Sequence, residues 1–356
     1  MKKVITVVGA RPQFIKAAVV SPLLREKNEE IIVHTGQHYD YNMSEQFFEQ
    51  LSIPQPNYNL GISGGSHAQM TGQMMMSLED IIYNVKPDAM LVYGDTNSTL
   101  AAALVAAKIH VPIYHVEAGV RTHSMTNPEE INRICTDHIS SMLFACTEAS
   151  MEELKREGLY EKSYLSGDLM YDAFIRYSNN MKLEDIELKT LSGDIIRVEN
   201  RYNYLTCHRE ENTDDKKLKE ILDAMSDLNM ETIYPVHPRN KERIKRLCTD
   251  NQYNNIKFVE PVGYLESIVL VNNSELVVTD SGGVQREAFW AKKKCITILN
   301  FPVWIETMVD NRNLLAKPEK KDILEKLQVP QYIDEKYRPF GDGNAANKIV
   351  KIINTL

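Results

Sequence analysis

The sequence has few cysteines, and they are not arranged as disulfide partners or metal ligands. Its 356 residues include an odd number of them, Cys135, Cys146, Cys207, Cys248 and Cys295. This pattern indicates reduced thiols in a cytoplasmic protein, and it lacks the Cys/His spacing of a structural zinc site. Cys207 precedes a histidine, but a cysteine at a strand end is more often a small buried hydrophobe than a nucleophile. We therefore expect Cys207 to be packed in a core.

The chain also lacks a long apolar run and an excess of positive charge. No segment approaches the roughly 20 apolar residues that a membrane span requires. The short apolar run that ends at Gly9 is too brief for the core of a signal peptide. A net charge of -8 disfavours broad contact with a phosphate backbone. We expect a cytoplasmic protein with no membrane partner and no nucleic-acid partner.

Two nucleotide-binding signatures are missing from the first strand-to-helix turn. Residues 9–16, GARPQFIK, have neither the GxGxxG spacing of a dinucleotide fingerprint nor the GK[ST] of a phosphate loop. The sequence thus gives no sign of a nicotinamide cofactor, and we expect neither a cofactor nor a metal. Arg11 precedes a proline at a helix start, and Lys16 follows one turn later. The two can hold an anion together, or can simply be solvated surface charges.

Apolar strand-like runs alternate with helical patterns along the whole chain. Such alternation predicts an α/β protein built from two Rossmann-like, doubly wound parallel sheets. Residues 165–201 have no buried-strand signature, so we place the domain boundary there. The predicted domains are residues 1–168 and 169–343. The final helix, residues 344–356, can pack on the N-terminal domain.

Acidic residues stand at the ends of two expected strands in the first half. Glu117 follows the apolar run 111–116, which places it at the carboxyl end of a buried strand, where open parallel sheets bind ligands. Asp95 ends the run VYGD before a Thr/Ser-rich helix start. It can act as an acid or base, or it can cap the following helix. Both residues are candidates for chemistry in one pocket.

A third acidic candidate lies at a helix start. Glu129 belongs to the segment NPEE, residues 127–130, in which an asparagine cap, a proline and two acidic residues also describe an ordinary helix start. Arg133 falls four residues after Glu129 and four before Asp137. The three residues can form a row of ion pairs along the helix, or Arg133 can hold a catalytic carboxylate in place.

The clearest phosphate-binding signal is in the second half, where the strand LVVTD runs into Ser281, Gly282 and Gly283 and then a helix. The glycines let backbone N–H groups approach a diphosphate, the helix start adds partial positive charge, and the serine supplies a hydroxyl. Glu287, one turn later, can accept hydrogen bonds from ribose hydroxyls. The alternative is a plain tight turn with a surface glutamate.

Two histidines also stand at expected strand ends. His208 lies in TCHREEN and His237 in PVHP. Both can contact a phosphate, although lone histidines are usually structural.

Together these segments carry a family resemblance. The chain resembles the non-hydrolysing UDP-N-acetylglucosamine 2-epimerases in seven motifs that occur in the family's order: GARPQFIKAA, TGQHYD, GDTNSTLA, HVEAGVR with PEEINR, HREEN, PVHP and TDSGGVQREA. The resemblance implies a glycosyltransferase-B type fold, a UDP-sugar bound between the two domains, a homodimer, and no metal or nicotinamide. It assigns as catalytic Asp95, Glu117, Glu129 and His208. It assigns to substrate binding Arg11, Lys16, Arg133, His237, Ser281, Gly282, Gly283 and Glu287.

The activity that the resemblance implies is reversible C2 epimerisation of UDP-N-acetylglucosamine to UDP-N-acetylmannosamine, by elimination and re-addition of UDP, for cell-surface polysaccharide precursors. Residues 37–43 and 299–306 depart from the family's usual pattern. These departures leave open activation by a second UDP-sugar, and a substrate such as UDP-2,3-diacetamido-2,3-dideoxy-glucuronate. Further alternatives are a hydrolysing epimerase that releases free N-acetylmannosamine, a glycosyltransferase, and a UDP-sugar binding protein without turnover.

Overall fold

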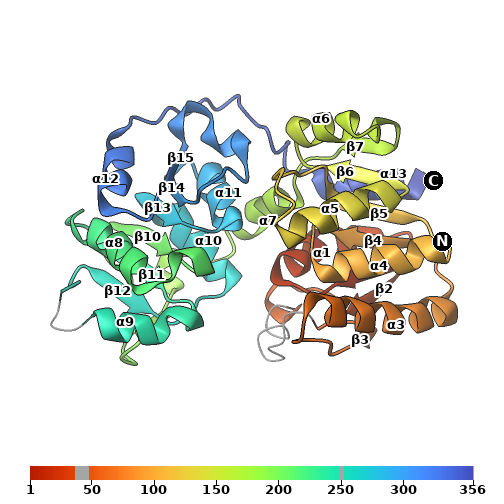
Figure 1. The fold of residues 1–356 in the computed structure, drawn as a ribbon, viewed down its shortest axis with the longest axis horizontal. Helices are drawn as coiled ribbons and strands as arrows, with labels where there is room; N and C mark the ends of the chain where they lie inside the picture. Colours follow the sequence, from red (N-terminus) through yellow and green to blue (C-terminus); the bar gives the residue numbers. More distant parts are fainter. Residues whose placement is uncertain (37–47, 249–251, 356) are drawn as a thin grey trace. The chain divides into compact units, whose positions relative to one another are not determined.

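The chain forms two compact units that each contain a parallel sheet. The computed structural model describes residues 1–36, 48–248 and 252–355. Unit 1 comprises Met1–Ala173 and Arg338–Leu356, and unit 2 comprises Phe174–Tyr337 (Figure 1). The predicted α/β class with two doubly wound sheets is confirmed. Residues 37–43, where the sequence departs from the family pattern, lie outside the described residues.

Unit 1 is built on a sheet with the strand order β3-β2-β1-β4-β5-β6-β7 in its described part. Its strands, which all pair in parallel, are β1 (Lys3–Val8), β2 (Glu29–His34), β3 (Tyr58–Asn59), β4 (Ala89–Tyr93), β5 (Ile113–Ala118), β6 (Met142–Ala145) and β7 (Ser163–Leu165). Its helices are α1 (Arg11–Leu24), α3 (His67–Val85), α4 (Asn97–Lys108), α5 (Pro128–Ile139), α6 (Glu148–Arg156), the first part of α7 (Leu169–Tyr177), and α13 (Ala345–Thr355). The strand order reverses between β1 and β4, which is where open sheets of this kind bind ligands.

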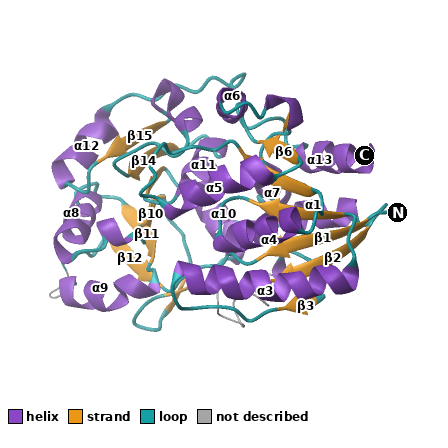
Figure 2. Ribbon diagram, turned by 45° about the vertical axis from the view of Figure 1, so that its right-hand side comes forward, coloured by secondary structure: helices purple, strands orange, loops and turns teal. Residues whose placement is uncertain are grey.

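The strands of unit 1 direct alternate residues to opposite faces, as the period of a strand requires. Ile5 and Val33 lie in a buried cluster with α3 and α4, which cover this face of the sheet (Figure 2). Thr6 and Ser21 both donate hydrogen bonds to the buried Glu30, so the other face meets α1. Helix α13 belongs to this unit and is tied to it by hydrogen bonds such as that from Lys2 to the Ile353 carbonyl oxygen.

Unit 2 repeats the architecture with the order β12-β11-β10-β13-β14-β15 among its described strands. These parallel strands are β10 (Tyr202–Thr206), β11 (Glu231–Pro235), β12 (Ile256–Val259), β13 (Leu276–Thr279), β14 (Lys294–Ile298) and β15 (Asn313–Ala316). A small antiparallel pair consists of β8 (Leu188–Lys189) and β9 (Ile195–Ile196). The helices are α8 (Asp215–Ser226), α9 (Lys241–Leu247), α10 (Tyr264–Asn273), α11 (Gly282–Trp290) and α12 (Lys320–Gln328). The order reverses here between β10 and β13.

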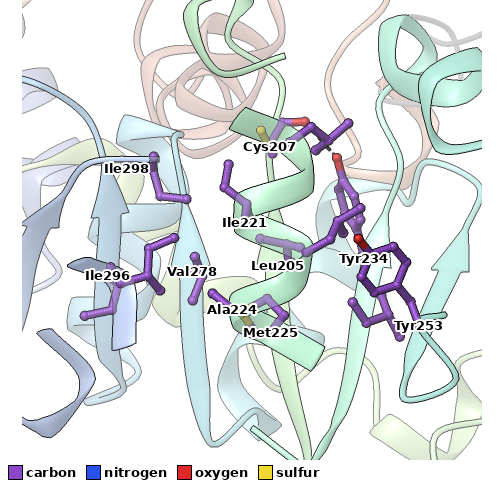
Figure 3. Packing of buried hydrophobic residues seen from close by; sticks show 14 of the residues in the cluster. Leu205, Cys207, Ile221, Ala224, Met225, Tyr234, Tyr253, Val278, Ile296 and Ile298 are labelled. Carbon is purple, nitrogen blue, oxygen red and sulfur yellow. Dashed lines mark hydrogen bonds between the residues drawn. The ribbon is translucent and has the colours of Figure 1, made fainter. Parts of the chain in front are cut away.

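The core of unit 2 explains the fate of Cys207. Figure 3 shows this residue in a cluster where Ile221 and Met225 of α8 lie against Leu205 and Val278 of the sheet. Cys207 is buried, and burial raises the pKa of its thiol well above the ordinary value. The expectation that Cys207 is a packed hydrophobe is confirmed. No helix within the described ranges is both long and apolar enough to cross a membrane.

The first strand-to-helix turn is fastened to the fourth strand by one glutamine. Gln13 Oε1 accepts hydrogen bonds from the backbone N–H groups of Gly9 and Ala10, at 2.8 and 3.0 Å. Its amide nitrogen donates to the Tyr93 carbonyl oxygen at 2.8 Å. The ends of β1 and β4 are therefore held together by this side chain, and Gly9 lies close to Thr35 and Ser98.

We expect Gly9→Ala to destabilise unit 1. A Cβ at Gly9 would lie 2.1 Å from Thr35 Oγ1 and 2.3 Å from Ser98 Oγ, both buried. Overpacking of this kind costs about 1–3 kcal/mol of unfolding free energy. The measurement is hydrogen exchange of the β1 amides during urea titration.

Gly72→Ala is the matched control. Gly72 lies within α3, and a Cβ there would meet nothing within 4 Å among the described residues. Alanine should stabilise this helix by roughly 0.5–1 kcal/mol. A Gly9→Ala protein as stable as the wild type would contradict the close packing described for this turn.

Candidate active site

The centre of the candidate site in unit 1 is a buried ion pair between α1 and β5. Lys16 Nζ lies 2.8 Å from Glu117 Oε2, and the two side chains are 3% and 12% exposed. Removing both charges from water costs several kcal/mol each, which only close geometry and further polar contacts offset. Lys16 is thus paired with Glu117 rather than being a solvated surface charge. Arg11, at the first position of α1, is half-buried.

The backbone of Glu117 is in an uncommon conformation. Its φ is +69°, in the left-handed region, and the pairing of β5 with β6 shifts register between Val116 and Ala118. A bulge of this kind redirects a side chain, and a non-glycine residue in such a conformation stores about 1–3 kcal/mol of strain. Gly94, after β4, lies close by, since a Cβ there would stand 3.5 Å from Lys16 Nζ. The ends of α1, β4 and β5 therefore converge.

Asp95 is held next to this pair by Arg133 of α5. The Arg133 guanidinium binds Asp95 Oδ2 through Nη2 and Glu130 Oε2 through Nη1, the latter at 3.1 Å. Burial works to lower the pKa of Arg133, but Asp95 and Glu130 outweigh it and the pKa is raised. Asp95 does not cap α4, because Thr96 Oγ1 accepts from the Thr99 N–H at that position. Of the two expected arrangements for Arg133, the structure has the one in which it holds a carboxylate.

The other alternative, a row of ion pairs through Glu129, Arg133 and Asp137, does not form, because Arg133 binds Asp95 and Glu130. Asp137 instead binds His115 and Arg121, at 2.7 Å each. The helical spacing is correct, but Asp137 is bound by two buried side chains from outside the helix, and Arg133 is bound by Asp95 and Glu130. Arg133 consequently binds the residue after β4, Asp95, whereas Asp137 binds His115 of β5 and Arg121.

The two adjacent glutamates at the start of α5 differ in their surroundings. Glu130 is buried and accepts hydrogen bonds from the N–H groups of Thr122 and His123. Burial works to raise the pKa of Glu130, but these bonds and Arg133 lower it overall. Glu129 is exposed, and within the described residues its carboxylate forms no hydrogen bond or ion pair. Glu130 is therefore structural, whereas Glu129 is available to a ligand.

Asp95 and Glu117 each form an ion pair with another candidate residue, Arg133 and Lys16 respectively. Within the part of the chain that the structure describes, Glu129 is connected to the site only through its position on α5. It stands one helical turn before Arg133 on α5, so it faces the same way from the helix. Asn127 caps this helix by accepting a hydrogen bond from the Glu129 N–H at 3.1 Å, as the sequence predicts.

A further group of side chains surrounds Glu117. One ligand atom each from Glu117, Cys146 and Asp168 lies within 4.8 Å of the other two. Cys146 and Asp168 follow β6 and β7, so neighbouring parallel strands deliver all three to one edge. Such a set has the donor types of a metal site, although acidic groups also gather without an ion. The expectation of no metal stays a prediction.

In unit 2, the candidate residues gather around a buried aspartate. Asp280 is 0% exposed and accepts hydrogen bonds from the N–H groups of His208 and Arg209, at 2.9 and 2.8 Å. His208 Nδ1 lies 2.9 Å from the same carboxylate. The His208 and His237 rings are 5.9 Å apart. The ends of β10 and β13 thus bring His208 against Asp280, and the end of β11 places His237 beside His208.

The SGG segment forms the start of α11. Ser281 caps the helix, with its Oγ accepting from the Val284 N–H at 3.4 Å, and this leaves its own hydroxyl hydrogen able to donate. Gly282 and Gly283 open the helix and are half-buried. Glu287 is buried in the second turn of α11 rather than lying on the surface.

The divergent segment 299–306 packs directly on this helix. The Arg286 guanidinium stands 4.1 Å from the centroid of the Trp304 ring. A Cβ at Gly282 would lie 3.6 Å from Trp304 Nε1. Trp304, which is 4% exposed, therefore lines the start of α11 with an aromatic surface.

Sequence reasoning missed Asp280, Cys146 and Asp168. Asp280 directly precedes the SGG segment at the same strand end, so its position in the sequence could have marked it as a candidate site residue. Cys146 and Asp168 also follow strands, but strand order had to be known before they could be grouped with Glu117.

The pH dependence of the stability of unit 2 should depend on the ionisation of Asp280. Burial works to raise its pKa, but His208 and the backbone N–H groups of residues 208 and 209 lower it overall. Because the folded pKa lies below the ordinary value near 3.8, the carboxylate stabilises the fold above about pH 5, and this contribution is lost as pH falls below about 4.

We expect Asp280→Asn to lower the unfolding free energy of unit 2 by about 2–3 kcal/mol at neutral pH, since several bonds to a charged acceptor are lost. The deficit should shrink below about pH 4. Both tryptophans, Trp290 and Trp304, lie in unit 2, so tryptophan fluorescence during urea unfolding measures it. A deficit that does not change with pH would contradict the ionised state of Asp280.

Comparison with known proteins places this geometry in a family. A model of the family UDP-N-acetylglucosamine 2-epimerase matches residues 23–354. A UDP-N-acetylglucosamine 2-epimerase homolog of Methanococcus maripaludis is 45% identical, over 99% of this chain and 100% of the relative. The UDP-2,3-diacetamido-2,3-dideoxy-D-glucuronate 2-epimerase of Pseudomonas aeruginosa is 44% identical, with the same coverage.

A solved structure agrees with the sequence comparison. The UDP-GlcNAc 2-epimerase of Methanocaldococcus jannaschii, in complex with UDP-GlcNAc and UDP, superposes with a TM-score of 0.84 at 35% identity, over 99% of this chain and 100% of that one. The family match spans both units, and the relatives are matched over their whole length. The chain belongs to the UDP-N-acetylglucosamine 2-epimerase family.

Proposed function

We propose that this protein is a non-hydrolysing epimerase that interconverts UDP-N-acetylglucosamine and UDP-N-acetylmannosamine by inversion at C2 of the sugar. The observation that carries the proposal is the arrangement in unit 1, where Glu117 and Asp95 are each held by a buried cation. Carboxylates fixed beside cations at one sheet edge suit proton transfer to and from a bound sugar. Membership of the family supports the same activity.

The chemistry explains why more than one carboxylate is needed. The C2 hydrogen neighbours an amide nitrogen rather than a carbonyl, so a carboxylate with a pKa near 4 cannot remove it unaided. Breaking of the C1–O bond to UDP leads: positive charge grows at C1, and this acidifies the C2 hydrogen. The carboxylate takes that proton and the C–H electron pair forms the C1–C2 double bond. The products of this half-reaction are UDP and a 2-acetamidoglucal.

The return half-reaction must use the other face of the alkene. A protonated acid delivers a proton to C2 from that face, and a UDP oxygen re-forms the bond to C1, which restores the starting charge balance. Two differently placed acid/base groups are therefore required. Asp95, Glu117 and Glu129 are the candidates. Lys16 and Arg133 hold two of these carboxylates, Glu117 and Asp95, in a fixed orientation before the sugar binds.

Unit 2 is the proposed nucleotide-binding unit. The N–H groups at the start of α11, the Ser281 hydroxyl and the helix dipole favour a diphosphate. His208 and His237 can donate to the leaving phosphate, on which negative charge grows as the C1–O bond breaks. Glu287 is proposed to accept from the ribose. Arg11 is proposed to contact the anionic part of the substrate from unit 1.

A second substrate is also favoured by an observation. The relative that acts on a diacetamido-glucuronate is 44% identical, nearly the same as the 45% of the UDP-N-acetylglucosamine 2-epimerase homolog. The same acid/base set serves either sugar, because the reaction at C2 is unchanged. The substituents at C3 and C6 decide between the two substrates.

We further propose that the protein acts in the cytoplasm as a homodimer and supplies precursors of cell-surface polysaccharides. Met76 and Tyr83 of α3, seven residues apart on one helix, are 64% and 59% exposed and offer an apolar surface for a second copy. Light scattering should give twice the chain mass. A monomer at micromolar concentration would contradict the dimer.

Incubation in deuterated water tests the activity. With UDP-N-acetylglucosamine, we expect NMR to show deuterium at C2 in both epimers, because the proton removed exchanges with solvent. The diacetamido-glucuronate substrate should be assayed in parallel, and the faster reaction identifies the substrate class. Inversion without C2 exchange would rule out the mechanism, and accumulation of free UDP would indicate the hydrolysing alternative.

The role of Glu129 has a matched control in the same assay. Glu129→Gln should reduce C2 exchange by about 10²–10⁴-fold, the range for loss of a general acid or base. Glu148 is also an exposed glutamate in the first turn of a helix, α6, so Glu148→Gln should leave the rate unchanged. Equal rates for both variants would remove Glu129 from the mechanism.

A further inference from the structure

One buried histidine behind the unit 1 site has an acceptor at each ring nitrogen. His115 Nδ1 lies 2.7 Å from Asp137 Oδ1, and His115 Nε2 lies 2.7 Å from the Gly94 carbonyl oxygen. His115 and Asp137 are both 0% exposed. A backbone carbonyl can only accept a hydrogen bond, so Nε2 must carry a hydrogen. The state of the ring then depends on where the proton between Nδ1 and Asp137 resides.

The surroundings of Asp137 place that proton on the histidine. Its Oδ2 atom accepts from the Gly119 N–H at 3.0 Å and from the Arg121 guanidinium at 2.7 Å. Burial works to raise the pKa of Asp137, but His115 and Arg121 lower it overall. An ionised carboxylate has no hydrogen to donate, so Nδ1 must be the donor.

The charges around the ring balance. Arg121 also binds Glu157 at 2.7 Å, so the cluster contains two cations and two anions when His115 is charged. Lys162 lies beyond it and donates to the Asp137 carbonyl oxygen at 3.1 Å. If His115 were neutral and Asp137 protonated, Arg121 would lose its fully buried counter-charge and keep only the partly exposed Glu157. Such a loss is strongly unfavourable.

The acceptor of Nε2 belongs to the turn that carries Asp95. Gly94 also donates its N–H to the Val116 carbonyl oxygen at 2.9 Å, so residues of β5 form hydrogen bonds with both the N–H and the C=O of Gly94. Helix α5 holds the next residue, Asp95, through a hydrogen bond that Asn132 donates to the Asp95 carbonyl oxygen at 2.8 Å. The turn after β4 is thus fixed between β5 and α5.

We propose that His115 is a buried imidazolium and a positioning residue for the reaction. Through Asp137 it joins α5 to β5, and through the Gly94 carbonyl it sets the turn that presents Asp95 beside Lys16 and Glu117. It does not touch the substrate. The part of this proposal that concerns rate rests on the proposed epimerase activity, whereas the part that concerns the charge of the ring does not.

Nitrogen-15 NMR of the histidine-labelled protein tests the charge at about pH 8, where an unperturbed imidazole has lost its second proton. We expect His115, assigned with a His115→Asn variant, to show a bonded hydrogen on both ring nitrogens. In Asp137→Asn, an amide replaces the carboxylate and can donate to Nδ1, so only Nε2 should carry a hydrogen. A single ring N–H in the wild type would overturn the proposal.

Steady-state kinetics test the positioning. His115→Gln keeps one donor for the Gly94 carbonyl but cannot also donate to Asp137. Since a displacement of about 1 Å can cost 10²-fold in rate, we expect kcat for C2 exchange to fall about 100-fold, with KM and UDP binding changed less than threefold. An unchanged kcat, or a loss confined to KM, would overturn the positioning role.

His110 provides the matched control for the kinetics. This residue is exposed, with φ at +65°, a conformation that asparagine tolerates, so His110→Asn should have wild-type kinetics. If the wild type itself shows no C2 exchange, the proposed function fails while the NMR result still decides the charge of His115. If His115→Gln does not fold, the wild-type and Asp137→Asn spectra still decide it.

Discussion

The unit 1 site depends on one constraint: Glu117 must hold a left-handed backbone conformation while its carboxylate meets the buried Lys16. The strand would otherwise continue and direct this side chain elsewhere. The bulge in β5, where its pairing with β6 shifts register, accommodates this backbone conformation. The ion pair with Lys16 compensates for the strain of that conformation. Gly94 completes the arrangement: its φ of +63° favours glycine, and it places the end of β4 close to both charges.

The two units use the same principle in different chemical forms. In unit 1, the order of strands reverses between β1 and β4, and the residues that follow these strands include Lys16 and Asp95. In unit 2, the reversal lies between β10 and β13, which are followed by His208 and Asp280. One edge carries carboxylates fixed by cations, and the other carries histidines and N–H groups around a carboxylate. The first suits proton transfer and the second suits an anionic leaving group.

Much of this could be predicted from the sequence, because the signals are local. Apolar runs gave the strands, the Asn-Pro-Glu-Glu segment gave the start of α5, and the SGG segment gave the start of α11. These features depend on neighbours within a few residues. The assignment of catalytic and substrate-binding roles stays a prediction, since the family relationship and the geometry support it without testing it.

The remaining features could not be predicted, because they depend on how distant segments come together. Spacing along α5 suggested that Asp137 pairs with Arg133, yet the fold brings Asp137 to His115 of a neighbouring strand. Nothing local distinguishes Glu130, which is buried, from Glu129, which is exposed. The left-handed backbone of Glu117 also follows from strand register rather than from the residue itself.

A double-mutant cycle on Lys16 and Glu117 tests the central claim most directly. The unfolding free energy of unit 1, from hydrogen exchange of its strand amides, should be compared for Lys16→Met, Glu117→Gln and the double variant. Removing one partner of a buried pair costs about 3–5 kcal/mol, whereas replacing both is far less costly. We expect the double variant to be less destabilised than the sum of the single variants by at least about 2 kcal/mol. Effects that add within about 0.5 kcal/mol would show that the two charges act independently and would contradict the account.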